Sequence, residues 1–273
     1  MNVSAPNTES ASIAKLNHIV SFALDTGTFL LSSGAHCGRI NRNINRMVKV
    51  WNVNIELYFS FTGILATAYY TDNPNNAVTR YKKAPEYGVN FNAINEVSQL
   101  SWLVDSQKIS VEEASEALQE IKVIKPYPKI LLLLGIGMSC ACLCLVAGGG
   151  WRDATFAFIA AISGMFVRLI MQKKGFNTMI AITLAAFVTT FITSLNMVGA
   201  LDAVWGAGLN PRGAMATAVL YLVPGVPLTN SVIDLIEGYI STSLFRAAFG
   251  AFILLCIAVG MSLSIFLFGI DNF

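Results

Sequence analysis

Polar residues that follow a proline-broken apolar run are the strongest candidates for chemistry in this sequence. Residues 214–223 are apolar, and Pro224, Gly225 and Pro227 then interrupt the run. Proline removes a backbone donor, and an unsatisfied backbone group in hydrocarbon is costly, so such a break is tolerated where the backbone is buried in protein or lines a cavity. The break therefore predicts a cavity at mid-membrane depth. A proline-kinked helix packed against its neighbours is the alternative.

The residues after the break have side chains that suit an anion site. Thr229 and Asn230 are good N-cap residues, so we expect a half-helix to begin there with its free N–H groups facing the cavity. Many secondary transporters hold carboxylate substrates and coupling ions with discontinuous helices of this kind. We therefore predict substrate contacts from Pro224, Gly225, Pro227, Thr229, Asn230 and Asp234.

Ionisable residues within the apolar segments form a second group of candidates. Such a side chain at the bilayer centre costs roughly 2.5–3.5 kcal/mol and is usually retained for a use. Asp234 is placed to exchange protons, and Arg246 is its expected ion-pair partner, with Glu237 near the inner surface. Arg168 either takes part in gating or extends its charge to the surface. We assign Glu237, Arg246 and Arg168 to ion pairing or gating.

Enzymatic and metal chemistry find little support. The chain has only His18 and His36, and neither completes a nucleophile–His–acid arrangement. Cys140, Cys142 and Cys144 lie in an uncharged apolar run and are expected to pack rather than to form disulfides or bind zinc. No basic run with interleaved aromatics indicates nucleic acid. We expect no catalytic residue, no metal and no cofactor.

Composition divides the chain into a soluble part and a membrane part. Overall, 55% of the residues are hydrophobic and 12% are charged, which is too apolar for an ordinary soluble protein. The charge is uneven, since 22 of the 34 charged residues precede Pro128. The fold class predicted is a polytopic α-helical membrane protein with an N-terminal soluble α+β domain. Its expected parts are a disordered tail (1–11), a cytoplasmic α+β domain (12–124), a linker (125–128) and a five-helix transmembrane domain (129–273).

Periodicity and turn residues predict the elements of the first domain. Helical spacing indicates helices over residues 12–31, 39–48 and 94–103, and Ser110 with Glu113 fits a capping box that opens a helix to about Ile124. Alternation predicts three strands, at 54–61, 64–70 and 77–82, with a hairpin turn at 72–76.

Five apolar segments follow, because about 20 residues suffice to cross the roughly 30 Å hydrocarbon core. They cover 129–148, 154–171, 178–195, the broken 213–236, and 244–268. Lys and Arg residues cluster at the ends that share a side with the N-terminal domain, which favours a cytoplasmic N-terminus and a periplasmic Phe273. Asn196 and Asp202 lie at the outer end of the third segment and form either an exit or a plain loop.

Several motifs occur in a fixed order along the chain. They are Gly34-Ala35, Arg39, the helix start at 109–114, Tyr127-Pro128, residues 224–228, Asp234, Gly238-Tyr239 and Arg246-Ala247. With these residues the chain resembles the threonine/serine exporter (ThrE-like) family from about Ile13 onward. One departure is Arg39-Ile40-Asn41, where the family has Arg-x-Glu. This departure argues against an acid-dependent activity of the N-terminal domain.

The resemblance implies a function. It implies export of threonine, serine or a small dicarboxylate such as succinate across the bacterial inner membrane, driven by the proton gradient. Full-length members carry a second membrane half, so the chain is similar to one subunit of split, two-component (succinate-type) exporters. We expect membrane lipid, a small-molecule substrate, and a second, shorter membrane subunit or a homo-oligomer as partners. The rival hypothesis is a membrane-anchored enzyme or sensor whose active part is residues 12–124.

Overall fold

The computed structural model describes residues 8–124, 127–199, 202 and 206–270. Most of the predicted tail, residues 1–7, lies outside the described residues, as do Lys125 and Pro126 of the predicted linker. The chain forms two compact units. The first comprises Met1–Lys125 with Val226–Ala248, and the second comprises Pro126–Gly225 with Phe249–Phe273. The predicted transmembrane domain is thus divided, because residues 226–248 belong with the N-terminal part.

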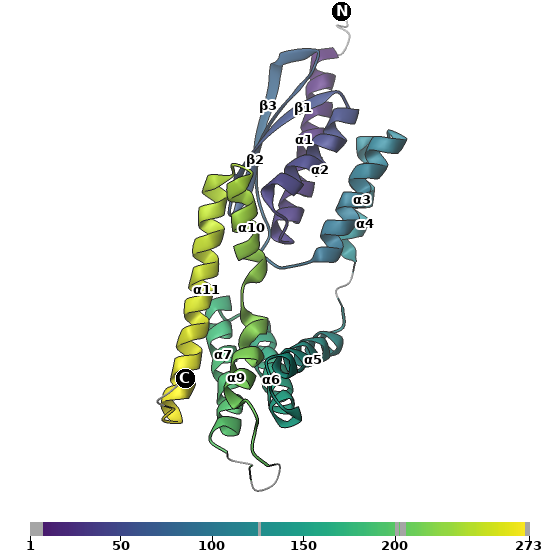
Figure 1. Ribbon diagram of the computed structural model, residues 1–273. Helices are drawn as coiled ribbons and strands as arrows, with labels where there is room; N and C mark the ends of the chain where they lie inside the picture. Colours follow the sequence, from purple (N-terminus) through teal and green to yellow (C-terminus); the bar gives the residue numbers. More distant parts are fainter. Residues whose placement is uncertain (1–7, 125–126, 200–201, 203–205, 271–273) are drawn as a thin grey trace, which may run out of the picture. The chain divides into compact units, whose positions relative to one another are not determined.

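The first unit is built on a three-stranded antiparallel sheet in the order β1-β2-β3. Its elements are α1 (Thr8–Ser32), α2 (Cys37–Val50), β1 (Val53–Ser60), β2 (Gly63–Tyr70), β3 (Asn73–Lys83), α3 (Phe91–Gln107) and α4 (Val111–Val123). Helices α1 and α2 cover one face of the sheet, α1 against β2 and β3 and α2 against β1 (Figure 1). Their buried apolar residues form one core with the inward residues of the strands and of α3 and α4.

Local signals placed most of these elements correctly. The capping box is present, since Glu113 N donates to Ser110 Oγ and Ser110 N donates to the Glu113 carboxylate. The predicted β2–β3 turn, residues 72–76, starts too late and is too long. In the structure Tyr70 pairs with Asn73, so only two residues form the turn. Pro74 is tolerated in β3 because this strand lies at the edge of the sheet.

Residues 226–248 form a helical hairpin, which we call the hairpin. It contains most of α10 (Gly225–Ile236) and the start of α11 (Ile240–Leu267), and Gly238 turns the chain between them with φ +88°. Thr242 Oγ1 donates to Phe59 O at 3.0 Å, and the Tyr239 ring packs edge-on against Phe59. The hairpin therefore packs against the end of β1.

The half-helix begins earlier than predicted. Its first residue is Gly225, so Thr229 and Asn230 lie in the second turn and do not cap it. The reason is that the first N–H groups of a helix have no intrahelical partner, so Pro227 in the first turn removes no bond. Both prolines therefore separate α10 from the preceding helix without delaying its start.

The second unit is a bundle of apolar helices. It contains α5 (Lys129–Val146), α6 (Trp151–Lys173), α7 (Thr178–Met197), α9 (Pro211–Val219), the 3-10 turn η1 (Leu220–Leu222) and the remainder of α11. Helix α6 packs between α5 and α7, and α9 contacts all three. Small residues permit this packing, since a side chain at Gly164 would overlap Thr189 and Tyr221.

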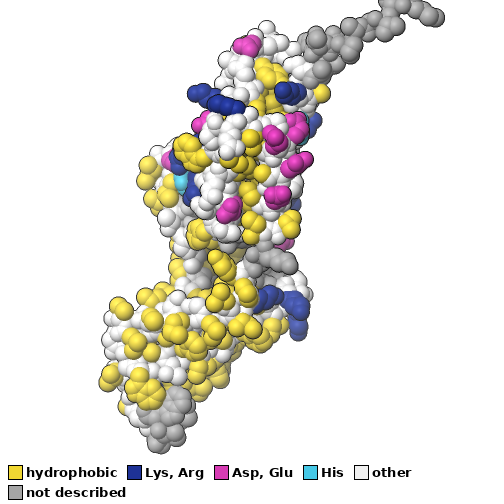
Figure 2. Space-filling model, turned by 90° about the vertical axis from the view of Figure 1, so that its right-hand side faces the viewer, with side chains coloured by type: hydrophobic (Ala, Val, Ile, Leu, Met, Phe, Trp, Pro, Cys, Tyr) yellow, Lys and Arg dark blue, Asp and Glu magenta, His cyan; other side chains and the backbone are white. Residues whose placement is uncertain are grey.

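Among the described residues, α5, α6, α7 and α11 are long and apolar enough to span a membrane, and α9–η1 with α10 adds a fifth span if the broken pair counts as one. Figure 2 shows hydrophobic side chains covering most of the visible face of the second unit, while most of the visible charged side chains lie on the first. The chain is thus a mostly helical protein with four or five candidate membrane helices and one small sheet.

Candidate functional site

Polar side chains of the hairpin converge on residues 34–37, which comprise the loop before α2 and the first residue of that helix. Asp234, on α10, has no exposed surface, and its Oδ1 accepts a hydrogen bond from Cys37 N at 2.7 Å. Cys37 is the first residue of α2. A helix N-terminus presents free N–H groups and a partial positive charge, so it stabilises a carboxylate at this position. The Asp234 carboxylate is therefore bound as an anion by the chain's own helix.

Arg246, on α11, completes the surroundings of this carboxylate. It is 2% exposed, its Nη2 donates to Ala35 O at 2.8 Å, and its Nε lies 3.3 Å from Asp234 Oδ2. The structure thus brings Arg246 and Asp234 together as an ion pair. Within the described part of the chain, Asp234 Oδ2 and Arg246 Nη1 have no hydrogen-bond partner. The pair is thus sealed from solvent and held by charge as much as by hydrogen bonds.

Two further side chains of the hairpin contact the same region. Asn230 Nδ2 donates to Gly34 O at 2.7 Å. Glu237 Oε1 accepts from Arg42 Nη1 at 2.9 Å, and its Oε2 lies 3.1 Å from His36 Nδ1. We call these contacts of Asn230, Asp234, Glu237 and Arg246 with residues 34–42 the clasp.

Gly38 makes room for the outer part of the clasp. A Cβ at this position would overlap the Glu237 carboxylate, so any side chain would displace it. Glu237 remains partly open, with 26% of its side chain exposed. Burial alone would raise the pKa of Glu237, but the hydrogen bonds and charges of Arg42 and His36 outweigh it and hold the pKa below its ordinary value. Glu237 is therefore bound as a carboxylate.

The His36 ring has two competing contacts. Its Nδ1 lies 3.3 Å from Arg39 N, which it caps as an acceptor, and 3.1 Å from Glu237 Oε2, to which it can only donate. One ring nitrogen cannot do both at once. The tautomer with a proton on Nδ1 donates to Glu237, whereas the tautomer without it caps α2.

The clasp is a poor site for a cation or a nucleophile. Ligand atoms of His36, Asp234 and Glu237 lie within 4.8 Å of one another, which is compact enough for a metal ion. However, two guanidinium groups already pair with these carboxylates and would repel a cation. Burial, with a smaller contribution from the Asp234 charge, raises the pKa of Cys37 to about 12. Its thiol stays protonated, so it is neither a nucleophile nor a thiolate ligand.

The other predicted site residues do not join the clasp. Pro224 is buried, whereas Gly225 and Thr229 are exposed. Arg168 lies on α6 in the second unit, and its Nε has no hydrogen-bond partner among the described residues. Asn196 Nδ2 donates to Asp153 Oδ1 at 2.8 Å. Asp202 Oδ1 lies 2.5 Å from Arg152 Nη1.

Sequence reasoning missed the α2 side of the clasp. His36 was considered only for catalysis, and neither Cys37 nor Arg42 was named as a candidate. No local signal links them to residues 195–201 positions away. It also missed Asp153, whose oxygens accept from Gly150 N and Asn210 N as well as from Asn196, joining the ends of α6, α7 and α9.

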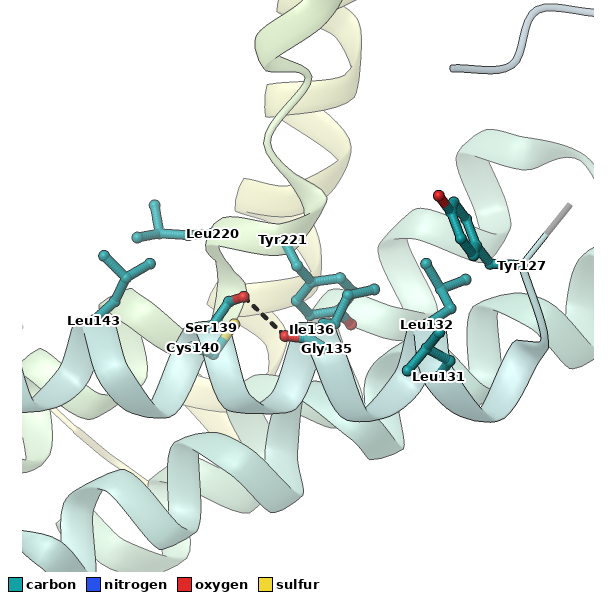
Figure 3. A pocket seen from close by; sticks show the side chains of 10 residues that line it. All are labelled: Tyr127, Leu131, Leu132, Gly135, Ile136, Ser139, Cys140, Leu143, Leu220 and Tyr221. Atoms are coloured by element: carbon teal, nitrogen blue, oxygen red, sulfur yellow. Dashed lines mark hydrogen bonds between the residues drawn. The ribbon is translucent and has the colours of Figure 1, made fainter. Parts of the chain in front are cut away.

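The second unit carries a groove of about 470 Å³ between α5 and η1 (Figure 3). It is lined by Tyr127, Tyr221, Leu220 and one face of α5, including Leu131, Ser139 and Leu143. The Tyr221 hydroxyl is already hydrogen-bonded to Thr189 Oγ1 at 3.0 Å, and Ser139 Oγ donates to Gly135 O. An almost wholly apolar lining suits an acyl chain or a helix face rather than a carboxylate.

Comparison with known proteins decides the family. Residues 21–268 match the family described as "Putative threonine/serine exporter". The chain belongs to this exporter family. The resemblance inferred from the sequence is confirmed, and the function of the protein is transport. No solved structure matches the chain.

Individual relatives carry two kinds of name. The chain is 28% identical over 253 residues to "Probable succinate transporter subunit YjjP" of Escherichia coli (strain K12), covering 92% of this chain and 95% of that protein. It is 25% identical over 227 residues to the "Threonine/serine exporter" of Corynebacterium glutamicum, covering 81% of this chain and 45% of that one. A "Probable threonine/serine exporter" of Mycobacterium tuberculosis is 26% identical, with 78% and 38% covered. These names indicate transporters, not enzymes.

The buried ion pair predicts strong coupling between its partners. Replacing Arg246 with Gln leaves the Asp234 charge buried and unpaired, so we expect a loss of about 3–5 kcal/mol in the free energy of unfolding. Asp234→Asn should behave similarly, whereas the double variant should lose less than the sum. Denaturant unfolding of the full chain in detergent measures this, with exposed Arg212→Gln as control. Losses that add to within about 0.5 kcal/mol would show that the pair is not coupled.

Glu237 predicts a pH dependence. Because its folded-state pKa is lowered, its contribution to stability is fully present above the ordinary value of 4.5 and is lost as pH falls through the folded-state value. Glu237→Gln should therefore unfold at a lower temperature than the wild type at pH 7, and the difference should shrink on acidification below that value. Thermal unfolding across this pH range tests it, with exposed Glu86→Gln as control. A difference that is constant with pH would contradict the assignment.

Proposed function

We propose that this chain is one subunit of an exporter that moves small carboxylate metabolites out of a bacterial cell across the cytoplasmic membrane. The observation that carries the proposal is the length of the match. The alignment covers 95% of the relative named as a succinate transporter subunit, but 45% and 38% of the two relatives named as threonine/serine exporters. The relative that matches over nearly its whole length is named a subunit, so we infer a second membrane protein as the counterpart of this chain.

Two substrate classes fit the family. Succinate is favoured by the relatives of equal length, and threonine or serine by the family description and the longer relatives. All of these substrates present a carboxylate of similar size. A dicarboxylate is our first choice, because the length of the match and the name of the relative agree.

The first unit is proposed to be cytoplasmic. Lys122 lies in α4, Lys129 begins α5, and Lys173 with Lys174 ends α6, so the positive charges share one side of the membrane. Residues 12–124 then form a cytoplasmic domain, and Phe273 is periplasmic after α11.

The clasp suggests how the hairpin takes part in transport. Asn230 and Asp234 are engaged within the chain, so we assign them to closing the clasp, together with Glu237 and Arg246, rather than to direct substrate contact. Gly225 and Thr229 are exposed beside the Pro224 and Pro227 break and remain the proposed substrate contacts. Arg168 is retained as a gating residue, because a buried guanidinium nitrogen without a partner is costly unless another state satisfies it.

The proposed orientation predicts the outcome of reporter fusions. Truncations fused after Lys174 and after Gly238 should both score as cytoplasmic, because Gly238 belongs to the first unit, and a fusion after Phe273 should score as periplasmic. A fusion after Ala147, at the far end of α5, serves as the periplasmic control. If the fusions after Gly238 and Phe273 report the same side, α11 does not cross and the proposed topology is wrong.

Export is predicted to require two proteins. In a strain lacking its own exporters, intracellular and extracellular succinate, threonine and serine are measured by mass spectrometry with this chain alone, with a short companion membrane subunit alone, and with both. Only the combination should lower intracellular levels of one substrate class, because one half of a transporter cannot close its pathway on both sides. Robust export by the purified monomeric chain in liposomes would contradict the proposal. Export by the chain as a homo-oligomer would replace the companion with a second copy.

A further inference from the structure

The hairpin carries its polar residues inside and its apolar residues outside. Its buried face holds Asn230, Asp234 and Arg246, together with the hydrogen-bonded hydroxyls of Thr242 and Ser243. Its outward face holds six large apolar side chains, each more than half exposed: Val232, Leu235, Ile236, Ile240, Leu244 and Phe245. This is the reverse of the pattern of a helix pair in water.

The six residues lie on the exposed sides of the two arms of the hairpin, and we call them the apolar face. On α10 they recur at spacings of three and four residues, and on α11 Leu244 follows Ile240 by four residues with Phe245 beside it. Both helices direct their polar sides into the clasp, so their apolar sides face away from the first unit. Six large apolar side chains exposed on one helix pair are typical of a contact with membrane or with another protein.

Charged residues beside the apolar face favour a protein over lipid as the molecule that covers it. Ile236, the most exposed of the six, is followed directly by Glu237, which pairs with the half-exposed Arg42. Lipid chains against Ile236 would bring this ion pair to the edge of the hydrocarbon, whereas a protein partner could keep it hydrated at the rim of an interface. Protein interfaces commonly have an apolar centre and a charged, solvent-accessible rim. The Glu237–Arg42 ion pair therefore gives the apolar face a charged rim, which suits a protein partner better than lipid.

The lengths of the relatives indicate which protein. The exporters from Corynebacterium glutamicum and Mycobacterium tuberculosis are more than twice as long as their alignment with this chain, whereas the relative of equal length is named a subunit. We propose that the apolar face of the hairpin is the docking surface for the companion membrane subunit, which places apolar helix side chains against Leu244 and Phe245. The inference rests on the proposed function, since it names the partner surface of that exporter.

Photo-crosslinking tests the occupant. Benzoyl-phenylalanine replaces Phe245 in the full chain, co-expressed in membranes with the companion subunit. The matched control replaces Phe266, an exposed phenylalanine of the same helix in the second unit. We expect an adduct with the mass of the companion from position 245 and lipid adducts from position 266. Lipid adducts alone from position 245, an adduct with a second copy of this chain, or companion adducts from position 266 only would each overturn the proposal.

A variant pair separates docking from folding. Leu244→Ala with Phe245→Ala should reduce co-purification of the companion by about tenfold or more, as truncation of central interface residues does. Its unfolding temperature should match the wild type, because neither side chain contributes a contact to the clasp. The control is Leu263→Ala with Phe266→Ala. If both pairs retain the companion equally, the apolar face is not its docking surface.

Failure of the proposed function gives a different result. Export by the wild-type pair is measured in the same cells. If the pair exports but position 245 gives no companion adduct, the docking surface is wrong and the function stands. If the adduct forms but neither succinate nor an amino acid is exported, the function is wrong and the surface stands.

Discussion

The buried carboxylate of Asp234 at the N-terminus of α2 is the interaction on which the first unit depends. It has no contact with solvent, and its charge is compensated by one helix N-terminus and one guanidinium. Removing a charged group from water is costly, so such a carboxylate is stable only where its compensation is complete. Asp234 lies on α10 and Arg246 on α11. If either helix moved away from α2, its charged side chain would become exposed or would leave the other one buried without its partner. The pair thus fixes both arms of the hairpin to one loop.

The proline break gives this interaction its place in the chain. Helix α9 with η1 belongs to the second unit, whereas all of α10 after Gly225 belongs to the first. Pro224 ends the preceding turn, and Pro227 occupies a position where no hydrogen bond is lost. The two prolines therefore act as a boundary between units, and the polar residues that follow them serve the first unit.

Features that depend on neighbouring residues, or on the few charges in the apolar segments, could be predicted from the sequence. Ser110 and Glu113 form their capping box from neighbouring residues alone, and Asp234 with Arg246 stood out because so few charges occur in the apolar segments. The start of α10 was predicted incorrectly, since proline was taken as a barrier to the helix although its first turn accepts it. The α2 side of the clasp could not be predicted, because Cys37 meets Asp234 across 197 positions and donates through its backbone, which every residue type carries. The need for glycine at position 38 is explained only by the contact with Glu237, whose carboxylate a Cβ at this position would overlap.

Exposure divides the clasp into an outer and an inner layer. The outer pair, Glu237 with Arg42, is open to water, with 26% and 57% of the side chains exposed, so solvent competes for it and the pair contributes little on its own. The inner pair is sealed, with 0% for Asp234 and 3% for Arg246, so water reaches it only after the hairpin moves. Solvent therefore reaches Glu237 and His36 before the inner pair, and His36 Nδ1 cannot serve the helix cap and the carboxylate at once. We expect the inner contacts to open together. The Asp234 carboxylate balances the Arg246 charge, so breaking one contact would leave the other group buried and unpaired. Contacts of this kind suit a conformational switch, because partial opening would leave a charge buried without its partner.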